Sequence, residues 1–166
     1  MPSVVGQTSE AQQRKTGPGS EKPQWDEPSF FEHLANQRPP EEVAVAHSIL
    51  EWASQRVTHI WWGKGQRAGS FVPTLEHHGT DHQLFAVWSS GSVEIYFYWY
   101  AYKPLFASEA RRLEILEKLN AIPGIALPES AIRRRPNIPL ADLVGDNRLN
   151  QFLEVFDWYL EQVKTS

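Results

Sequence analysis

The sequence of 166 residues contains no cysteine. This absence excludes disulfide bonds, thiolate metal sites, iron–sulfur clusters and a cysteine nucleophile, and it favours a reducing compartment. Long apolar runs are missing too. Residues 1–20 lack the apolar core, about 7–15 residues long, of a signal peptide, and the most apolar run, 93–102, is too short for a membrane helix. We therefore expect a cytoplasmic protein that does not contact a membrane.

A strong excess of either charge is also absent. The 16 Lys and Arg residues against 20 Asp and Glu residues give a formal net charge of −4. This mild acidity argues against a protein that coats nucleic acid by charge alone. The chain does hold 41% hydrophobic and 12% aromatic residues, which is enough for a core. Its length suits one domain of about 100–200 residues.

The composition changes near residue 24. Residues 1–23 are rich in Gly, Ser, Gln, Pro and Lys and hold almost no large apolar side chain. Such a segment cannot bury enough apolar surface to offset the entropy lost on ordering. We expect a disordered N-terminal tail over 1–23 and a single domain over 24–166, without internal repeats.

The apolar pattern of this domain predicts helices at both ends and strands between them. Helices are expected from Ser29, over 40–55, over 108–120, over 139–145 and from 147 onward. Strands are expected over 57–62, 70–76, 82–88 and 93–101. The order indicates an α+β fold, with N-terminal helices, a four-stranded antiparallel meander and C-terminal helices packed on one sheet face.

Two of the predicted strands carry further expectations. Pro73 cannot donate a hydrogen bond to a neighbouring strand, so its strand should be at an edge or bulged. In the last strand, alternation places Trp99 on the core face with the apolar residues. The same alternation places Tyr96, Tyr98 and Tyr100 on the opposite face, where another element or a partner would cover them.

Five segments resemble a small bacterial α+β domain that has no established activity. They are WWGKGQRAGSFVP, VWSSGSVEIYFYWY, RRLEILEKLNAIPGI, RRRPNIPLADL and FLEVFDW, and the resemblance spans roughly residues 24–164. Such domains stand alone or are attached to larger proteins, some of them of restriction or DNA-repair character. The resemblance implies a compact module with an accessory role near nucleic acid, and it carries over no catalytic residue.

The glycine-rich loop that precedes the second strand is a candidate binding site. It lacks the Gly–Lys–Ser/Thr sequence of a phosphate-binding loop. It also leads into a predicted strand, whereas a phosphate-binding loop leads into a helix. One interpretation is a hairpin connection in which glycine supplies unusual backbone angles. The other is a ligand or nucleic-acid contact, in which Lys64 and Arg67 supply charge while Trp61 and Trp62 supply stacking surfaces.

A second basic segment lies near the end of the chain, at Arg133, Arg134 and Arg135. Clustered arginines can contact phosphates, and the alternative is a solvated loop paired with nearby carboxylates.

Two more side chains are unusual for their predicted helices. Arg112 falls in an apolar sector, so its stem should pack while its head reaches solvent or a carboxylate. Trp158 falls among polar residues and should meet the segment around Trp25–Phe31 or mark an interaction surface.

The turn at 77–82 is a candidate metal site. His77, Asp81 and His82 are residue types that bind Zn²⁺ or another divalent ion, and a hairpin can bring the two histidines together. No known ligand spacing is matched, and a polar turn is the alternative. A nuclease-type Glu-x-Lys motif is also missing, because Tyr96 stands two residues after Glu94.

The leading hypothesis from the sequence is a non-catalytic bacterial module, without cofactor, that binds protein or nucleic acid in DNA handling or defence. The alternative is a metal-dependent hydrolase or nuclease with its site near the 77–82 turn. No Gly-x-Ser-x-Gly nucleophile motif is present to support a serine hydrolase.

Overall fold

The computed structural model of the protein describes residues 24–145 and 147–166, so the expected disorder of residues 1–23 lies outside the described residues. The helices are α1 Glu27–Gln37, α2 Pro40–Ser54, α3 Phe97–Tyr100, α4 Glu109–Asn120 and α5 Arg148–Lys164. The strands are β1 His59–Trp62, β2 Ser70–His77, β3 Thr80–Gln83, β4 Phe85–Trp88, β5 Ser92–Ile95 and β6 Asn137–Pro139. Three 3-10 turns, η2 Pro104–Phe106, η3 Glu129–Arg133 and η4 Leu140–Leu143, complete the described elements.

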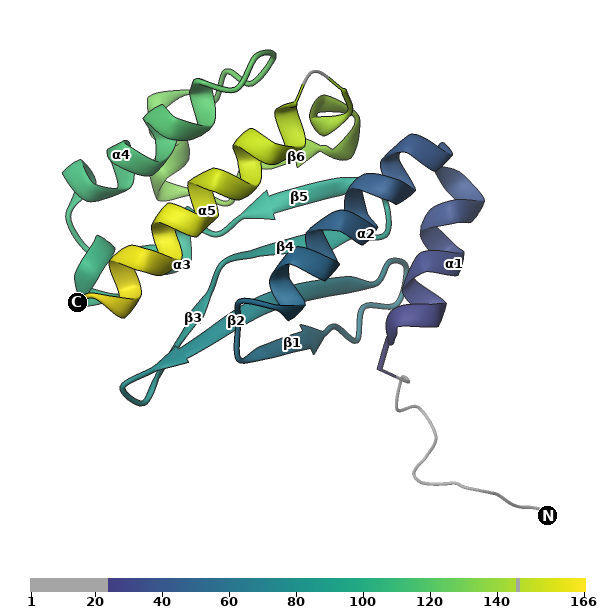
Figure 1. Cartoon of the computed structure of the whole chain (residues 1–166), viewed down its shortest axis with the longest axis horizontal. Helices are drawn as coiled ribbons and strands as arrows, with labels where there is room; N and C mark the ends of the chain where they lie inside the picture. The colour runs from purple at the N-terminus through teal and green to yellow at the C-terminus, as the bar shows by residue number, and fades with distance from the viewer. Residues whose placement is uncertain (1–23, 146) are drawn as a thin grey trace.

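The strands form one antiparallel sheet in the order β1-β2-β4-β5-β6, with β3 paired to β2 (Figure 1). The predicted α+β class is confirmed, with helices before and after the strands. The predicted count of four strands is too low, since the described residues form six. Two local features account for the difference: the expected strand 82–88 is interrupted, and residues 137–139 add an edge strand beside β5.

A bulge at Leu84 separates β3 from β4. Thr74 pairs with Gln83, whereas Phe71 pairs with Val87, so the register shifts by one residue between the two pairs. This bulge lies opposite Pro73, and the Leu84 N–H donates to the Pro73 carbonyl at 3.0 Å. Of the two predicted alternatives, the edge strand is wrong, because β2 lies between β1 and β4. The other alternative, a bulge, is present, with the extra residue in the strand that pairs with β2. A central strand accommodates the proline because the irregular partner does not need its missing N–H.

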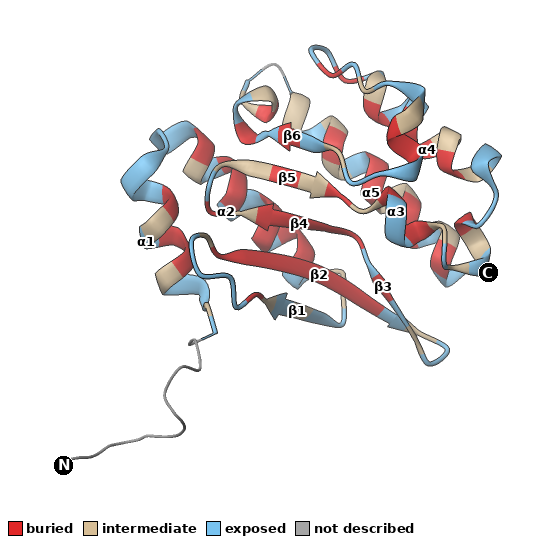
Figure 2. Ribbon diagram, turned by 180° about the vertical axis from the view of Figure 1, so that it is seen from behind, coloured by how far each residue is buried: buried red, intermediate tan, exposed pale blue. Residues whose placement is uncertain are grey.

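The two faces of the sheet differ in what covers them. One face packs against α1, α2 and α5, and its side chains belong to the main apolar core, among them Phe71, Leu75, Phe85, Val87, Val93, Ile95 and Ile138 (Figures 1 and 2). In Figure 2 no helix lies over the other face, which we call the open face. Strand alternation places Trp61, Val72, Ala86, Trp88 and Glu94 on the open face.

The last predicted strand ends early, and this changes the orientation of its aromatic residues. β5 stops at Ile95, and the chain then turns into α3, where the Tyr98 N–H donates to the Arg134 carbonyl at 2.8 Å. Side chains in a helix step by about 100° instead of 180°. Tyr100 is consequently buried and donates its hydroxyl to the Leu84 carbonyl, while Trp99 is 41% exposed. The predicted faces of Trp99 and Tyr100 are both wrong.

Helix boundaries follow their capping residues. Ser108 caps α4 by accepting a hydrogen bond from the Arg111 N–H, which confirms the predicted helix 108–120. α1 begins earlier than expected, because Asp26 and Ser29 form a reciprocal capping box.

Arg112, on the buried side of α4, is only 5% exposed. Its guanidinium donates to the carbonyls of Phe106, Ala107 and Ile132 at 2.8–3.0 Å. The sequence predicted a head group in solvent or on a carboxylate, and the structure instead gives it backbone carbonyls as partners. The one side chain therefore ties η2, α4 and η3 together at the end of the sheet where α3 lies.

Candidate functional site

The two neighbouring tryptophans of β1 go to opposite faces of the sheet. Trp61 is on the open face and 43% exposed. Trp62 is half-buried on the core face, where its ring centroid lies 5.9 Å from that of Phe30 and 5.5 Å from that of Phe71. Of the predicted stacking pair, only Trp61 presents its ring to solvent.

The loop that follows β1 is held against the N-terminal segment by Trp25. The Trp25 backbone N–H donates to the Gly63 carbonyl at 3.0 Å, and its indole Nε1 donates to the Gly65 carbonyl at 2.8 Å. A Cβ at Gly69 would lie 2.5 Å from the Trp25 ring, so glycine is needed for this close approach. We call this region the loop end of the sheet.

Two cations extend from the loop end. Lys64 and Arg67 are exposed, and within residues 24–145 and 147–166 neither forms an ion pair. The loop end thus places one exposed tryptophan near two free cations, in a loop whose backbone is fixed by Trp25.

The three arginines after η3 have different surroundings. Arg133 pairs with Glu109 at 2.9 Å, and Arg135 lies 3.4 Å from Glu94 on the open face. Arg134 is exposed, and among the described residues its side chain has no ion-pair partner. Its carbonyl accepts the Tyr98 N–H, which places the free arginine beside α3.

An exposed aromatic cluster lies on α3 and the turn after it. Tyr98 and Trp99 are each 41% exposed and Tyr102 is 68% exposed. Their ring centroids are 4.9–6.2 Å apart, mostly edge to face, and the Tyr102 hydroxyl donates to that of Tyr98 at 3.3 Å. This hydrogen bond raises the pKa of Tyr102 above its usual value. Large aromatic side chains gathered in solvent are unusual unless they meet a partner.

Cations stand beside this aromatic cluster. Lys103 follows Tyr102 directly, and within the described ranges it makes no ion pair. We call Tyr98, Trp99, Tyr102, Lys103 and Arg134 the α3 surface. Sequence reasoning named Arg134 as a candidate contact and Tyr98 as part of a row that another element or a partner would cover. It missed Trp99, because it expected that residue in the core.

The three candidate metal ligands at the β2–β3 hairpin are divided between the two faces. Pairing of His82 with Leu75 puts His82 and His77 on the core face, whereas Asp81 pairs with Glu76 on the other. His82 is buried, and burial lowers its pKa, with further lowering from Lys103 and His77.

The hairpin supplies two imidazoles whose ring nitrogens, His77 Nε2 and His82 Nδ1, have no hydrogen-bond partner among the described residues. Across residues 24–145 and 147–166, no three His, Asp or Glu side chains gather as metal ligands. The two imidazoles of the hairpin are fewer than the roughly three protein ligands that a catalytic zinc site uses.

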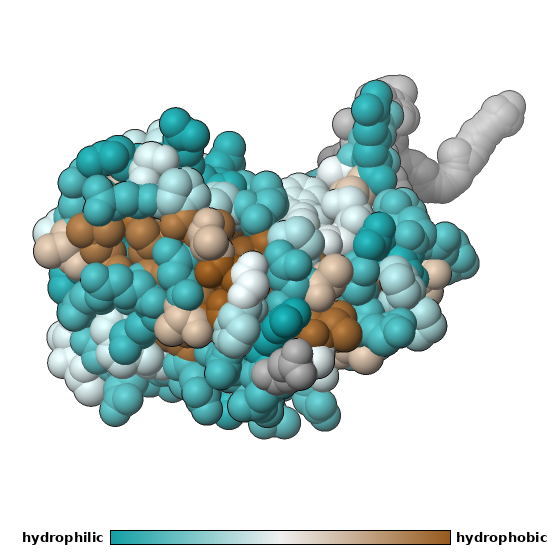
Figure 3. Space-filling model, turned by 90° about the horizontal axis from the view of Figure 1, so that it is seen from above, coloured by the Kyte–Doolittle hydropathy of each residue, from teal (hydrophilic) through white to brown (hydrophobic). Residues whose placement is uncertain are grey.

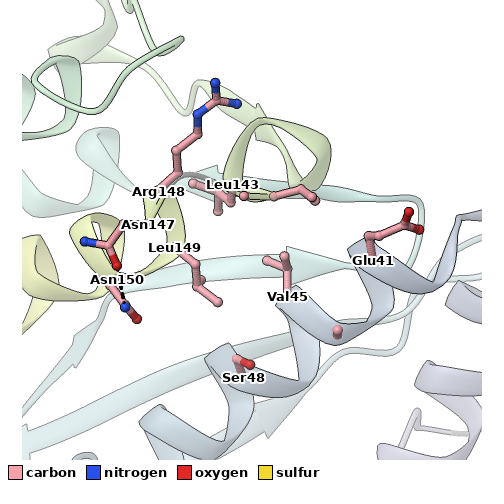
Figure 4. Close-up of a pocket in the computed structure, with 11 residues that line it drawn as sticks. Glu41, Val45, Ser48, Leu143, Asn147, Arg148, Leu149 and Asn150 are labelled. Atoms are coloured by element: carbon pink, nitrogen blue, oxygen red, sulfur yellow. Dashed lines mark hydrogen bonds between the residues drawn. The ribbon is translucent and has the colours of Figure 1, made fainter.

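A cleft of about 520 Å³ lies between α2 and the start of α5. Figure 4 shows Val45, Leu143 and Leu149 along its inner part, while the charged groups of Glu41 and Arg148 stand apart from one another. The cleft therefore has an apolar interior without converging acids and bases.

A groove of about 280 Å³ separates α4 from α5 and contains Trp158. The Lys118 ammonium lies 4.7 Å from the Trp158 ring centroid, so α4 covers this tryptophan instead of the expected segment around Trp25–Phe31. Ile122 and Val155 contribute apolar surface to the groove. Figure 3, which views the molecule from above, shows hydrophobic side chains gathered in a band between hydrophilic ones.

Comparison of the chain with protein-family models, with curated proteins and with solved structures found no match. The helices of the described residues are too short or too polar for any of them to cross a lipid bilayer.

Proposed function

We propose that the protein binds single-stranded nucleic acid, with the α3 surface as its contact site. The observation that carries this proposal is the joint exposure of Tyr98, Trp99 and Tyr102 beside two cations, Lys103 and Arg134, that have no acidic partner among the described residues. Unpaired bases need flat aromatic surfaces, and the backbone that joins them needs positive charge.

The aromatic part of the surface suits bases of any sequence. Each base offers a π-face, and stacking on an aromatic side chain contributes about 1–3 kcal/mol per base. The three rings lie within 6.2 Å of one another, which allows neighbouring bases to contact neighbouring rings. Duplex DNA keeps its bases stacked on each other, so this type of contact favours single strands.

The positive charge of the α3 surface is a local feature, because the chain as a whole carries a net charge of −4. Arg133 is already engaged by Glu109 and Arg135 by Glu94, so these two arginines add little free positive charge. Lys103 and Arg134 remain for phosphates. We therefore expect moderate affinity with a weak dependence on salt, in contrast to proteins that bind duplex DNA through many phosphates.

The experiment compares two tryptophans of nearly equal exposure at opposite ends of the sheet. Binding of a fluorescein-labelled 12-nucleotide single strand is followed by anisotropy for the unaltered protein, Trp99→Ala and Trp61→Ala. Trp99→Ala should weaken binding roughly tenfold, as the loss of one stacked base implies. Trp61→Ala should leave the affinity nearly unchanged. Equal losses would mean that the strand contacts both ends of the sheet, and a loss with Trp61→Ala alone would place the site at the loop end. Either result would contradict the α3 surface as the contact site.

A second comparison tests the phosphate contacts. Lys103→Gln with Arg134→Gln should make the salt dependence of log K less steep by about 1.4, because each single-strand phosphate contact contributes about 0.7. The matched control is Lys64→Gln with Arg67→Gln, which removes the same charge from the loop end. The proposal is wrong if neither pair changes the slope and the strand binds no better than a neutral peptide rich in aromatic residues.

A further inference from the structure

The groove between α4 and α5 has an apolar floor and two charged rims. Ile122 and Val155 lie along its floor beside the half-buried ring of Trp158. Lys118 stands on the α4 rim and Glu154 on the α5 rim, and both side chains are exposed. Within residues 24–145 and 147–166, neither of them forms an ion pair. The groove therefore combines apolar surface with two opposite charges that have no oppositely charged partner among the described residues.

The two helices run antiparallel along this groove. At one end, Arg111 from the start of α4 donates to Gln162 from the end of α5 at 2.8 Å. At the other end, Ile122, which follows α4, and Gln151, near the start of α5, line the groove together. Both helices rise about 1.5 Å per residue between these ends. The two rim charges consequently lie at nearly the same height along the groove.

We infer that this groove is the interface of a homodimer, in which a second copy of the chain is related by a two-fold axis that runs along the groove. This rotation places α4 of the second copy over α5, and α5 of the second copy over α4, with each facing pair antiparallel. Because the rim charges lie at the same height, Lys118 of each copy then faces Glu154 of the other. The four helices form an antiparallel bundle that closes over both apolar floors. A partner with charge of one sign would match one rim, whereas a second copy matches both.

The size of this interface sets the expected affinity. The 12 residues of α4 give a contact about 18 Å long, and two helices side by side are about 20 Å wide. The resulting footprint is smaller than the area of about 800 Å² that each partner buries in a standard stable complex. We therefore expect a dimer that forms and dissociates with concentration, with a dissociation constant in the micromolar range.

Charge reversal tests the interface in the full chain, by sedimentation velocity from roughly 5 to 500 µM, a range that brackets micromolar association. The unaltered protein should change from monomer to dimer over this range. Lys118→Glu and Glu154→Lys should each weaken association roughly tenfold, because one reversal makes two symmetry-related pairs repulsive. The double variant exchanges the two charges and should regain the original affinity. Loss of the Lys118 contact with Trp158 cannot explain such a recovery, because the double variant lacks that contact too.

Lys64→Glu is the matched control, since it makes the same charge change on an exposed cation of the loop end and should leave association unchanged. A second measurement needs no variant. Over the same concentrations, the NMR signal of the Trp158 indole N–H should shift, whereas that of the exposed Trp61 should not. A protein that stays monomeric over the whole range would overturn the inference, as would a dimer that the single reversals leave intact or that the double variant fails to restore. None of these outcomes bears on the proposed function, because no nucleic acid is present.

Discussion

Both ends of the sheet place a tryptophan near basic residues, but they use their aromatic side chains differently. At the loop end, Trp62 packs on Phe30 and Trp25 packs on the loop, so Trp61 alone remains exposed. At the α3 end, Tyr98, Trp99 and Tyr102 stay exposed and contact one another. At the loop end most aromatic side chains pack within the protein, whereas the α3 end offers an aromatic surface that nothing within the described residues covers.

The difference shows that a motif of aromatic and basic residues has no fixed meaning along a sequence. Trp61 and Trp62 are adjacent, and strand alternation assigns one to solvent and the other to the core. Tyr98 and Trp99 are also adjacent, yet a single turn of helix leaves both exposed. The backbone conformation decides how many rings a partner can reach.

The largest expected effect concerns the support of the α3 end. Arg112→Met should lower the free energy of unfolding by about 3 kcal/mol, because the buried carbonyls of Phe106, Ala107 and Ile132 would lose a charged donor. Urea denaturation measures the change. Arg133→Met is the control at the same end, since its exposed pair with Glu109 should contribute under about 1 kcal/mol. Similar losses in the two variants would contradict the assigned role of Arg112.

A smaller effect is expected at the loop end. Gly69→Ala places a Cβ against the Trp25 ring and should destabilise the protein by about 1–3 kcal/mol, as overpacking does. Trp25→Ala removes the obstructing ring. In the double variant, the Gly69→Ala change should therefore cost less than it does alone, and chemical denaturation of all four proteins gives this coupling. Strictly additive losses would mean that Trp25 does not clamp the loop.

The smallest effect is a pH dependence from His82, which lies at the α3 end near Lys103, His77 and Asp81. Burial, Lys103 and His77 lower its pKa below the ordinary 6.5, while Asp81 opposes this. The unfolded chain then binds a proton more readily than the folded protein, so stability should fall as the pH drops below about 6.5. Thermal unfolding between pH 7.5 and 5 should show a shallower decline for His82→Leu. Equal declines would show that His82 remains able to protonate in the folded protein.

Much of the fold could be predicted because local patterns determined it. The helix from Ser108 to Asn120 has its cap and its apolar stripe in the sequence, and β2 has apolar residues at the alternate positions 71, 73 and 75. The last strand was predicted too long because its alternation of apolar and tyrosine side chains continues past Ile95. Only pairing with β6, whose three residues carry little signal, and the contact of Tyr98 with Arg134 show where it ends.

The candidate site was predictable only in part. The sequence by itself determined the α+β class, the helix at 109–120, the central hairpins and the presence of aromatic and basic residues in the same segments. Tertiary structure alone decided that Trp62 packs on the core face, that Trp99 is external, that Arg112 binds carbonyls and that Tyr159 is fully buried. The physical reason is that periodicity describes one element at a time. Which ring is buried, and which polar group lacks a partner, depends on the elements packed around it.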